Sequence, residues 1–363
     1  MKRPRLASIA IAILITLLTT ELALRLSLLI PITISSPYIP DDEMGFKLRP
    51  SEFTDADGFN NPHTEINPAP ARTTASDSIA FVGDSFTFGS YPAEAVFPAL
   101  VAADLGAEGI AARAINLGIP GAGPNSYVGV MRSYLPRLKP IAVVATIYLG
   151  NDVMQGDRRH PPKLWFGRIV NFGSIFSLDL DHLLVALTAG KFFRAAERAW
   201  HAHLTPAPDE PDQYFPPLPE KPLSRLRWNE LKAARITPDA DIARGNDGLV
   251  SYVEEMAALA RQNDTKFLVV LAPSQAELDP DLRTRIVQSF GENPSDFDGT
   301  LPARRVRNAL SARGILFVDL TPALMTAGPA SVYNRSDTHW NRRGNAIVAR
   351  VVADALKPLL APH

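Results

Sequence analysis

The sequence contains no cysteine among its 363 residues. Disulfides, thiolate nucleophiles and cysteine-ligated zinc or iron–sulfur sites are therefore excluded. The net charge is only -1 at pH 7, and a chain without a large positive charge is a poor candidate for nucleic-acid binding. The seven histidines form no His-Glu-x-x-His pattern, so we predict no metal and no other cofactor. With 46% hydrophobic residues, the chain can bury a sizeable core.

The longest apolar run lies at the N-terminus, after the basic residues Lys2, Arg3 and Arg5. An uncharged stretch covers residues 6–20, and apolar residues resume after Glu21 and Arg25. We interpret residues 1–35 as a membrane anchor: a single transmembrane helix with the rest of the chain extracytoplasmic. A cleaved signal peptide is the main alternative, although no small-x-small cleavage site follows the run, and a soluble amphipathic helix is the second alternative.

The next part of the chain, residues 36–76, is rich in Pro, Asp, Gly and Asn, so we predict an irregular segment that leads into the domain. From there to the end of the chain, short apolar runs alternate with amphipathic helical patterns. The candidate strands are residues 78–82, 112–117, 141–149, 266–272 and 315–320. The candidate helices are residues 93–105, 126–138, 249–262, 302–313 and 341–359.

This alternation predicts an α/β domain over residues 77–363, with a five-stranded parallel sheet covered by helices on both faces. A helical insertion interrupts it at about residues 155–241. Within the insertion, residues 178–204 have helical spacing and could form a lid, a membrane-surface contact or an amphipathic helix packed on the domain. The Pro-rich residues 205–222 suit neither a helix interior nor a central strand, so they predict a polyproline-like connector.

Four short motifs occur at strand ends or just before a helix of this pattern. Gly-Asp-Ser ends the first strand and exposes the Ser85 hydroxyl, and NLGIPGAGPNSY follows the second strand with Gly118. YLGND places Asn151 at the end of the third strand, and SDTHWNRRG brings Asp337 and His339 before the last helix. In parallel sheets, ligands bind beyond the carboxyl ends of the strands, where we expect these motifs to meet.

These residue types supply what acyl transfer needs: a nucleophile, a base, a group that orients the base, and donors for the oxyanion. Ser85 would attack, His339 would take and return the proton, and Asp337 would hold the imidazole tautomer. The N–H groups of Ser85 and Gly118 and the side-chain amide of Asn151 would bind the oxyanion. Each motif alone could be a turn or a packing feature, whereas four of them in this arrangement favour a catalytic site.

In this order, the four motifs resemble the blocks of the SGNH hydrolases, the GDSL esterase and lipase superfamily. The resemblance covers roughly residues 77–154 and 264–359, and it implies a flavodoxin-like three-layer α/β/α sandwich. The family's Ser, Gly, Asn and His correspond to Ser85, Gly118, Asn151 and His339. Phe86 replaces the usual Leu of Gly-Asp-Ser-Leu, and Ser336 stands where the acid usually lies. The Asp-x-His spacing is instead similar to the alginate O-acetylation proteins and related membrane-anchored SGNH proteins.

The resemblance implies a serine esterase or O-acyltransferase that works through an acyl-serine intermediate. Its expected substrate is an acetyl ester of a cell-surface polysaccharide or glycan, with polysaccharide assembly proteins as possible partners. A lipase or thioesterase acting on lipid acyl esters is an alternative. A non-catalytic carbohydrate-binding module of an exopolysaccharide assembly complex is another, and it would not need the nucleophile and base that are present.

The remaining polar candidates have structural interpretations. We expect Asp152 to support the loop of Asn151, Asp319 to cap a turn or helix, and Asn125 to cap the helix that follows it. Thr87 occupies the place of the second glycine in the Gly-x-Ser-x-Gly elbow, which disfavours a general α/β-hydrolase. The insertion histidines lack carboxylates at metal-ligand spacing, so we expect surface or packing roles for His160, His182, His201 and His203.

Overall fold

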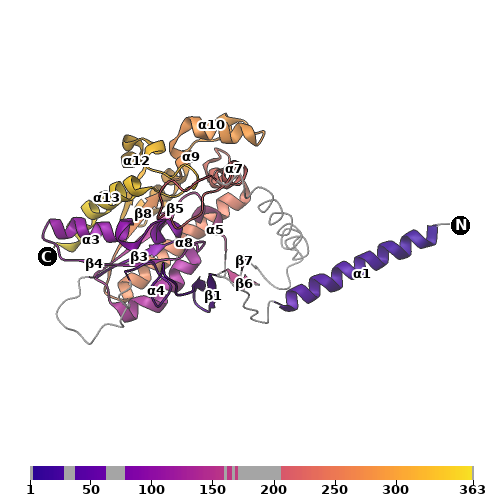
Figure 1. Cartoon of the computed structure of the whole chain (residues 1–363), viewed down its shortest axis with the longest axis horizontal. Coiled ribbons are helices and arrows are strands. Elements are labelled where there is room, and N and C mark those ends of the chain that lie inside the picture. The colour runs from indigo at the N-terminus through magenta and orange to yellow at the C-terminus, as the bar shows by residue number, and fades with distance from the viewer. Residues whose placement is uncertain are drawn as a thin grey trace.

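A five-stranded parallel sheet forms the centre of the protein (Figure 1). The computed structural model describes residues 3–27, 37–62, 78–158, 162–165, 168–170 and 206–361. The strands of the sheet are β3 (Ser78–Gly83), β4 (Arg113–Gly118), β5 (Ala142–Tyr148), β8 (Lys266–Ala272) and β9 (Phe317–Asp319). They lie in the order β4-β3-β5-β8-β9, and each neighbouring pair is parallel. This order is that of flavodoxin-like sheets, so the predicted fold class is confirmed for the sheet.

The strands form where the sequence has short, almost continuous apolar runs, because both faces of the sheet are buried. All residues of β3 and β5 are buried. Successive side chains point to opposite faces of the sheet. Accordingly, Ile79 and Phe81 belong to one hydrophobic cluster, whereas Ala80 and Val82 belong to the other.

Helices cover both faces and complete three layers (Figure 1). On one face, α3 (Phe97–Ala107) packs against α13 (Arg342–Leu360), and both contribute to the cluster around Phe81. On the other, α4 (Pro124–Leu138) packs against α8 (Ala240–Gln262), which also contacts α11 (Leu301–Ser311). The predicted α/β/α sandwich is therefore present.

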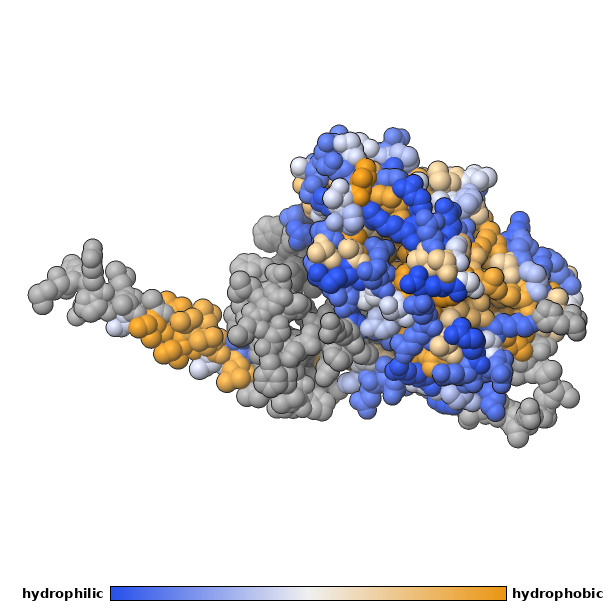
Figure 2. Space-filling model, turned by 180° about the vertical axis from the view of Figure 1, so that it is seen from behind, coloured by the Kyte–Doolittle hydropathy of each residue, from blue (hydrophilic) through white to orange (hydrophobic). Residues whose placement is uncertain are grey.

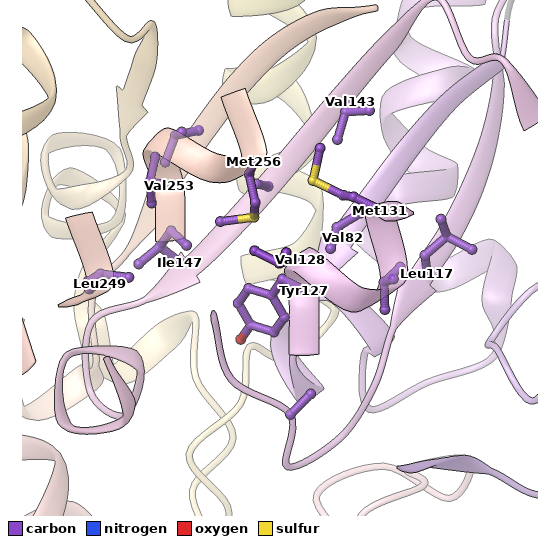
Figure 3. Close-up of a cluster of buried hydrophobic side chains, with 14 of the residues drawn as sticks. Val82, Leu117, Tyr127, Val128, Met131, Val143, Ile147, Leu249, Val253 and Met256 are labelled. Atoms are coloured by element: carbon purple, nitrogen blue, oxygen red, sulfur yellow. The ribbon is translucent and has the colours of Figure 1, made fainter. Parts of the chain in front are cut away.

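The core on the second face is built from side chains of α4, α8 and the strands (Figure 3). Met131 of α4 and Met256 of α8 lie between the two helices and the sheet (Figure 3). Both methionines are fully buried, and flexible thioether side chains fill irregular space of this kind. Tyr127 of α4 belongs to the same cluster.

Two predicted helix starts differ from the structure by several residues. α3 begins at Phe97 instead of residue 93. Val96 has an extended backbone, which separates α3 from a short 3-10 turn over Ala93–Ala95. α8 begins at Ala240 instead of residue 249, because the Asp239 side chain accepts a hydrogen bond from the Ile242 N–H and caps it.

The predicted cap of α4 is wrong. Its N-cap residue is Gly123, and Pro124 occupies the first helical position, where a missing N–H carries no cost. Asn125 lies inside the first turn, and its side-chain oxygen accepts a hydrogen bond from the Ser126 N–H at 2.8 Å.

Several shorter helices connect the larger elements. They are α2 (Ser85–Phe88), α5 (Asp152–Gln155), α9 (Gln275–Leu278), α10 (Pro280–Ser289) and α12 (Thr321–Ala327). Ser274 caps α9 in a capping box with Glu277, and Asp279 caps α10. α2 and α5 directly follow β3 and β5, so they lie at the carboxyl edge of the sheet.

The lead-in segment is more ordered than we predicted. It contains a hairpin of β1 (Tyr38–Asp41) and β2 (Gly45–Leu48). Its turn forms because Asp41 accepts hydrogen bonds from the Glu43 and Met44 N–H groups, and Gly45 adopts a φ of 83°. The side chains of Met44, Phe46 and Phe59 are buried in the domain core, so the expectation of an irregular lead-in is wrong over this hairpin.

The main regular elements in the described part of the insertion are a hairpin and a helix. These are the hairpin strands β6 (Lys163–Trp165) and β7 (Arg168–Val170) and the helix α7 (Glu220–Leu231). Of the predicted Pro-rich connector, residues 206–219 are neither helix nor strand, as predicted. Residues 220–222 instead form the first turn of α7, so the prediction is wrong there. The predicted helical part, residues 178–204, lies outside the described residues.

The N-terminal helix α1 (Arg3–Ser27) is present and exposes a band of aliphatic side chains, orange in Figure 2. Polar residues also lie along it, including Thr16 and Thr19, whose hydroxyls donate to backbone carbonyls one turn earlier. No helix in the part of the chain that the structure describes is long and apolar enough to cross a membrane. The prediction of a helix is confirmed, and its assignment as a transmembrane span is not.

Candidate active site

The predicted nucleophile lies at the turn between β3 and α2. Ser85 is the first residue of α2 and remains partly exposed, whereas the residues on both sides of it are buried. The helix begins there because Asp84 caps it: its Oδ1 accepts a hydrogen bond from the Phe86 N–H at 2.9 Å. The cap therefore fixes the backbone at Ser85, next to the carboxyl end of β3.

Side-chain amides hold the other end of α2. Asn116 Nδ2 donates to the carbonyl oxygens of Thr87 at 2.8 Å and Phe88 at 3.2 Å. Asn60, from the lead-in segment, donates to the Phe88 carbonyl at 2.7 Å. A helix of one turn leaves most of its backbone groups without helical partners, so these amides stabilise the conformation of the nucleophile turn.

Asn151 is joined to this turn through the carboxylate of Asp84. Its Nδ2 donates to Asp84 Oδ2 at 3.0 Å. Behind it, Asp152 accepts hydrogen bonds from the Tyr127 hydroxyl at 2.9 Å and from the Tyr148 N–H at 2.9 Å. The prediction that Asp152 supports the loop of Asn151 is therefore confirmed.

The carboxyl groups of Asp84 and Asp152 are both fully buried. Burial raises the pKa of Asp84, and the hydrogen bonds from Phe86 and Asn151 only partly offset it. Burial and the nearby charge of Asp84 raise the pKa of Asp152 well above its usual range. Paired buried carboxyls at the base of a site make its charge state sensitive to pH.

The predicted base and acid are in direct contact. His339 Nδ1 is hydrogen-bonded to Asp337 Oδ1, and the His339 backbone N–H also donates to Asp337 Oδ1 at 2.7 Å. Because Nδ1 faces a carboxylate, it carries the hydrogen, which leaves Nε2 free to accept a proton. The Asp-x-His segment therefore folds back on itself as the sequence predicted.

The imidazole lies between two phenylalanine rings. The Phe86 ring centroid is 4.9 Å from that of His339, and Phe86 directly follows Ser85. On the other face, Phe215 of the insertion stacks at 4.5 Å and 26°. The base is thus held beside the nucleophile turn. The Ser85 hydroxyl makes no hydrogen bond within the described ranges, and catalytic hydrogen bonds often tighten only when substrate binds.

Asp337 and His339 shift each other's pKa in opposite directions. Burial raises the pKa of Asp337, but the charge and hydrogen bonds of His339 outweigh burial, so the pKa lies below its usual range. Burial lowers the pKa of His339, but Asp337, Asp84 and Glu230 together raise it above the usual histidine value. The imidazole is therefore a stronger base than an isolated histidine.

The predicted oxyanion donors differ in their availability. The Ser85 N–H lies in the first turn of α2, where no intrahelical acceptor exists. Asn151 has a second N–H besides the one donated to Asp84. The Gly118 N–H, in contrast, already donates to Asn116 Oδ1 at 2.9 Å. Three residues later, Gly121 is exposed with a φ of 81°, and its N–H donates no hydrogen bond within the described ranges.

Gly118 instead serves close packing. A Cβ at this position would lie 2.3 Å from the Phe88 nitrogen and 2.8 Å from the Thr87 carbonyl carbon. Only glycine lets the end of β4 approach the backbone of α2 this closely. The structure therefore brings Ser85, Asn151, Asp337 and His339 to one edge, and it places Gly118 beneath the nucleophile turn.

Several residues of the site were missed from the sequence. Gln213 Nε2 donates to Asp337 Oδ2 at 3.0 Å, and Phe215 covers His339. Glu230 of α7 is 4% exposed, and burial raises its pKa to about 7. The positive charges of His339 and Arg227 lower this pKa but do not cancel the effect of burial. No motif spacing signals these residues, because all three belong to the insertion and reach the site only through the tertiary fold.

The other predicted polar residues have varied outcomes. Asp319 Oδ1 accepts a hydrogen bond from the Thr321 N–H at 2.9 Å, which confirms the predicted turn role just before α12, whose N-cap residue is Leu320. Ser336 is buried and precedes the acid that contacts His339. The four insertion histidines lie outside the described residues. Within the described ranges, no cluster of His, Asp or Glu is arranged to hold a metal ion.

Residues 233–363 match the family model described as "SGNH hydrolase-like domain, acetyltransferase AlgX". The matched range includes Asp337 and His339, whereas Ser85, Gly118 and Asn151 lie before it. The match confirms the predicted resemblance over residues 233–363, which include the Asp-x-His motif. No curated protein matches the chain.

Several solved structures are similar to this chain. A putative acylhydrolase from Bacteroides fragilis NCTC 9343 is 14% identical over 80% of this chain and 92% of its own, with a TM-score of 0.40. The lipase/acylhydrolase from Enterococcus faecalis is 14% identical over 79% and 98%, with a TM-score of 0.43. The acetyl xylan esterase AlAXEase is 14% identical over 77% and 99%, with a TM-score of 0.42. At such TM-scores the likeness carries no argument about activity.

The packing role of Gly118 can be tested with alanine. Gly118→Ala would push its methyl group into backbone atoms of α2, so we expect a loss of about 1–3 kcal/mol in the free energy of unfolding, measured in urea. Gly106→Ala is the matched control, since a Cβ there meets nothing within 4 Å inside α3, and it should be neutral or stabilise by up to about 1 kcal/mol. Equal stability of both variants would contradict the packing role.

The charge coupling of the dyad predicts a pH effect. Asp337→Asn removes the largest influence that raises the pKa of His339, so we expect that pKa to fall and the imidazole to stay neutral to lower pH. The measurement is an NMR titration of ¹⁵N-histidine-labelled protein, with the signal assigned through His339→Gln. An unchanged or higher pKa in Asp337→Asn would show that Asp337 does not govern the imidazole.

Proposed function

We propose that this protein cleaves acyl esters through an acyl-Ser85 intermediate. The proposal agrees with the match of residues 233–363 to an SGNH hydrolase-like domain, a match that supports an esterase or acetyltransferase enzyme. The observation that carries the proposal is the Asp337–His339 hydrogen bond, which directs the imidazole Nε2 away from the acid while the ring lies against Phe86. A base of this kind beside a serine at a helix start is the arrangement that activates a hydroxyl nucleophile.

In the proposed first half-reaction, His339 Nε2 takes the proton of Ser85 as Oγ bonds to the ester carbonyl carbon. The carbonyl electrons move to oxygen, and the Ser85 N–H and the free N–H of Asn151 stabilise the resulting oxyanion. The oxyanion then collapses, the ester C–O bond breaks, and the imidazolium returns its proton to the leaving alcohol. Asp337 stabilises the transient positive charge on His339 throughout.

The second half-reaction decides between hydrolase and transferase. Water attacking the acyl-Ser85 carbonyl releases a carboxylic acid, whereas a sugar hydroxyl takes the acyl group to form a new ester. His339 removes the proton from either nucleophile and returns it to Ser85 Oγ. Both outcomes use the same residues of this chain.

The proposed substrate is an acetyl ester of a cell-surface polysaccharide or glycan. The support is the Asp-x-His spacing and the match of residues 233–363 to a family described by an acetyltransferase. A lipase or thioesterase acting on lipid acyl esters is the alternative substrate class. A non-catalytic carbohydrate-binding module is disfavoured because the imidazole is held as a base that a binding protein would not need.

The proposal predicts covalent labelling at one serine. A fluorophosphonate probe should label the full chain, and p-nitrophenyl acetate should be turned over faster than its long-chain homologues. Ser85→Ala and His339→Ala should each reduce both signals by a factor of about 10³ or more, since removal of a triad member leaves only binding and oxyanion stabilisation.

The matched control is Ser251→Ala, an exposed serine on α8 whose hydroxyl bonds only to the helix backbone at 3.0 Å. It should keep wild-type labelling and turnover. If folded wild-type protein shows neither labelling nor turnover, the proposed serine chemistry is wrong and the binding-module alternative gains support.

We also propose that the domain is extracytoplasmic and associated with the membrane through its N-terminal segment. The support is the charge pattern, with three basic residues before the uncharged residues 6–20. The expected result is that full-length protein in its native host resists external protease until the outer permeability barrier is opened, and sediments with membranes. Recovery in the cytosolic fraction, with protection from protease until cell lysis, would contradict this location.

A further inference from the structure

The Pro-rich part of the insertion crosses the Asp-His loop at close range. Within it, we call residues 209–218 the 209–218 segment. Its backbone is tied to the domain at two points, where the Tyr214 N–H donates to the Ser90 carbonyl and the Leu218 N–H donates to the Ser336 carbonyl, both at 2.7 Å. A segment attached beside both the nucleophile turn and the acid cannot act only as a connector.

Acidic residues at the start of this segment pair with arginines on both sides of the dyad. Asp209 accepts from the Arg335 backbone N–H at 2.6 Å and from its guanidinium Nε at 3.2 Å. Glu210 and Asp212 both pair with Arg342, at the start of α13. Arg335 precedes Asp337 and Arg342 follows His339, so these contacts attach the segment at both ends of the Asp-His loop.

Gln213 is held in one orientation at this point. Its Oε1 accepts a hydrogen bond from the Asp209 N–H at 3.1 Å, so its Nε2 is the atom directed at Asp337 Oδ2, 3.0 Å away. An amide reversed end to end would place oxygen against a carboxylate and nitrogen against an N–H, losing both bonds. Gln213 is therefore oriented as a donor to the acid of the dyad.

The two oxygens of Asp337 have separate partners. Oδ1 faces His339 alone, through its ring and its backbone N–H. Oδ2 accepts from Gln213 and, at the longer distance of 3.4 Å, from Asn334. Because Asp337 is 3% exposed, its second oxygen has little access to water, and Gln213 supplies the shorter of these two hydrogen bonds.

We propose that Gln213 and Phe215 are positioning residues of the reaction: Gln213 fixes the Asp337 carboxylate from behind, and Phe215 fixes the plane of the His339 ring. This inference rests on the proposed function for its kinetic consequences. The insertion thereby completes the base of an active site whose other parts come from the sheet edge. Neither residue takes or gives a proton in the reaction.

The test replaces Gln213 in the full-length protein with side chains of similar size. Gln213→Met removes the donor and keeps the volume, so kcat for p-nitrophenyl acetate should fall roughly tenfold with KM within about twofold of wild type, as one hydrogen bond to a buried charge is lost. Tyr214→Phe is the matched control on the same segment, since its ring packs on Phe53 outside the dyad, and it should keep wild-type kcat.

Gln213→Glu gives a second measurement, the pH profile of kcat/KM, which would not change if Gln213 had only a structural role. The charged groups facing His339 are already Asp337 from its own loop, Asp84 from the nucleophile turn and Glu230 from α7. A further carboxylate behind Asp337 favours the imidazolium, so the acid limb of the pH profile of kcat/KM should move up by about one pH unit. Since glutamate matches glutamine in size, this variant decides the question if the methionine variant fails to fold.

An NMR titration of the His339 imidazole separates this inference from the proposed function. If wild type shows no turnover but Gln213→Glu raises the pKa of His339, the positioning role stands and the proposed reaction fails. If turnover is present while folded Gln213→Met keeps wild-type kcat and Gln213→Glu leaves both the pH profile and the His339 titration unchanged, the positioning role is wrong.

Discussion

The buried carboxylate of Asp337 is the constraint on which the rest of the site depends. A carboxylate removed from water is stable only when paired and hydrogen-bonded on both oxygens. Here one oxygen takes both N–H groups of His339, and the other takes the amides of Gln213 and Asn334. Satisfying the acid therefore fixes the tautomer and direction of the base, and it requires the insertion to lie over the loop.

The turn around Ser85 likewise depends on hydrogen bonds from side chains of other segments. α2 is one turn long, too short to be stable alone, so its ends depend on side chains from elsewhere. Asp84 caps its start and also binds Asn151, while Asn116 and Asn60 hold its last carbonyls. The lead-in segment, the second strand and the third strand thus converge on the few atoms around Ser85.

The sheet could be predicted because buried parallel strands require continuous apolar runs, as in β3 and β5, where every residue is buried. The hairpin around Gly45 was missed because its strands are only four residues long and lie among turn-forming residues. The start of α8 was missed because its amphipathic pattern is weak before Leu249, although Asp239 caps it. Short elements and helix ends depend on contacts that periodicity does not record.

The sequence by itself determined which residues compose the candidate site, since Ser85, Asn151, Asp337 and His339 each lie in a recognisable motif at the end of a predicted strand or before a helix. The sequence did not determine the role of Gly118. A glycine needed for close packing and a glycine whose N–H binds the oxyanion have the same sequence signature, and only the neighbouring atoms in the structure distinguish them. Tertiary structure alone decided that a Pro-rich segment more than a hundred residues from the dyad supplies partners for it. The physical reason is that hydrogen bonds and ring stacking act over a few ångströms in space, whatever the distance along the chain.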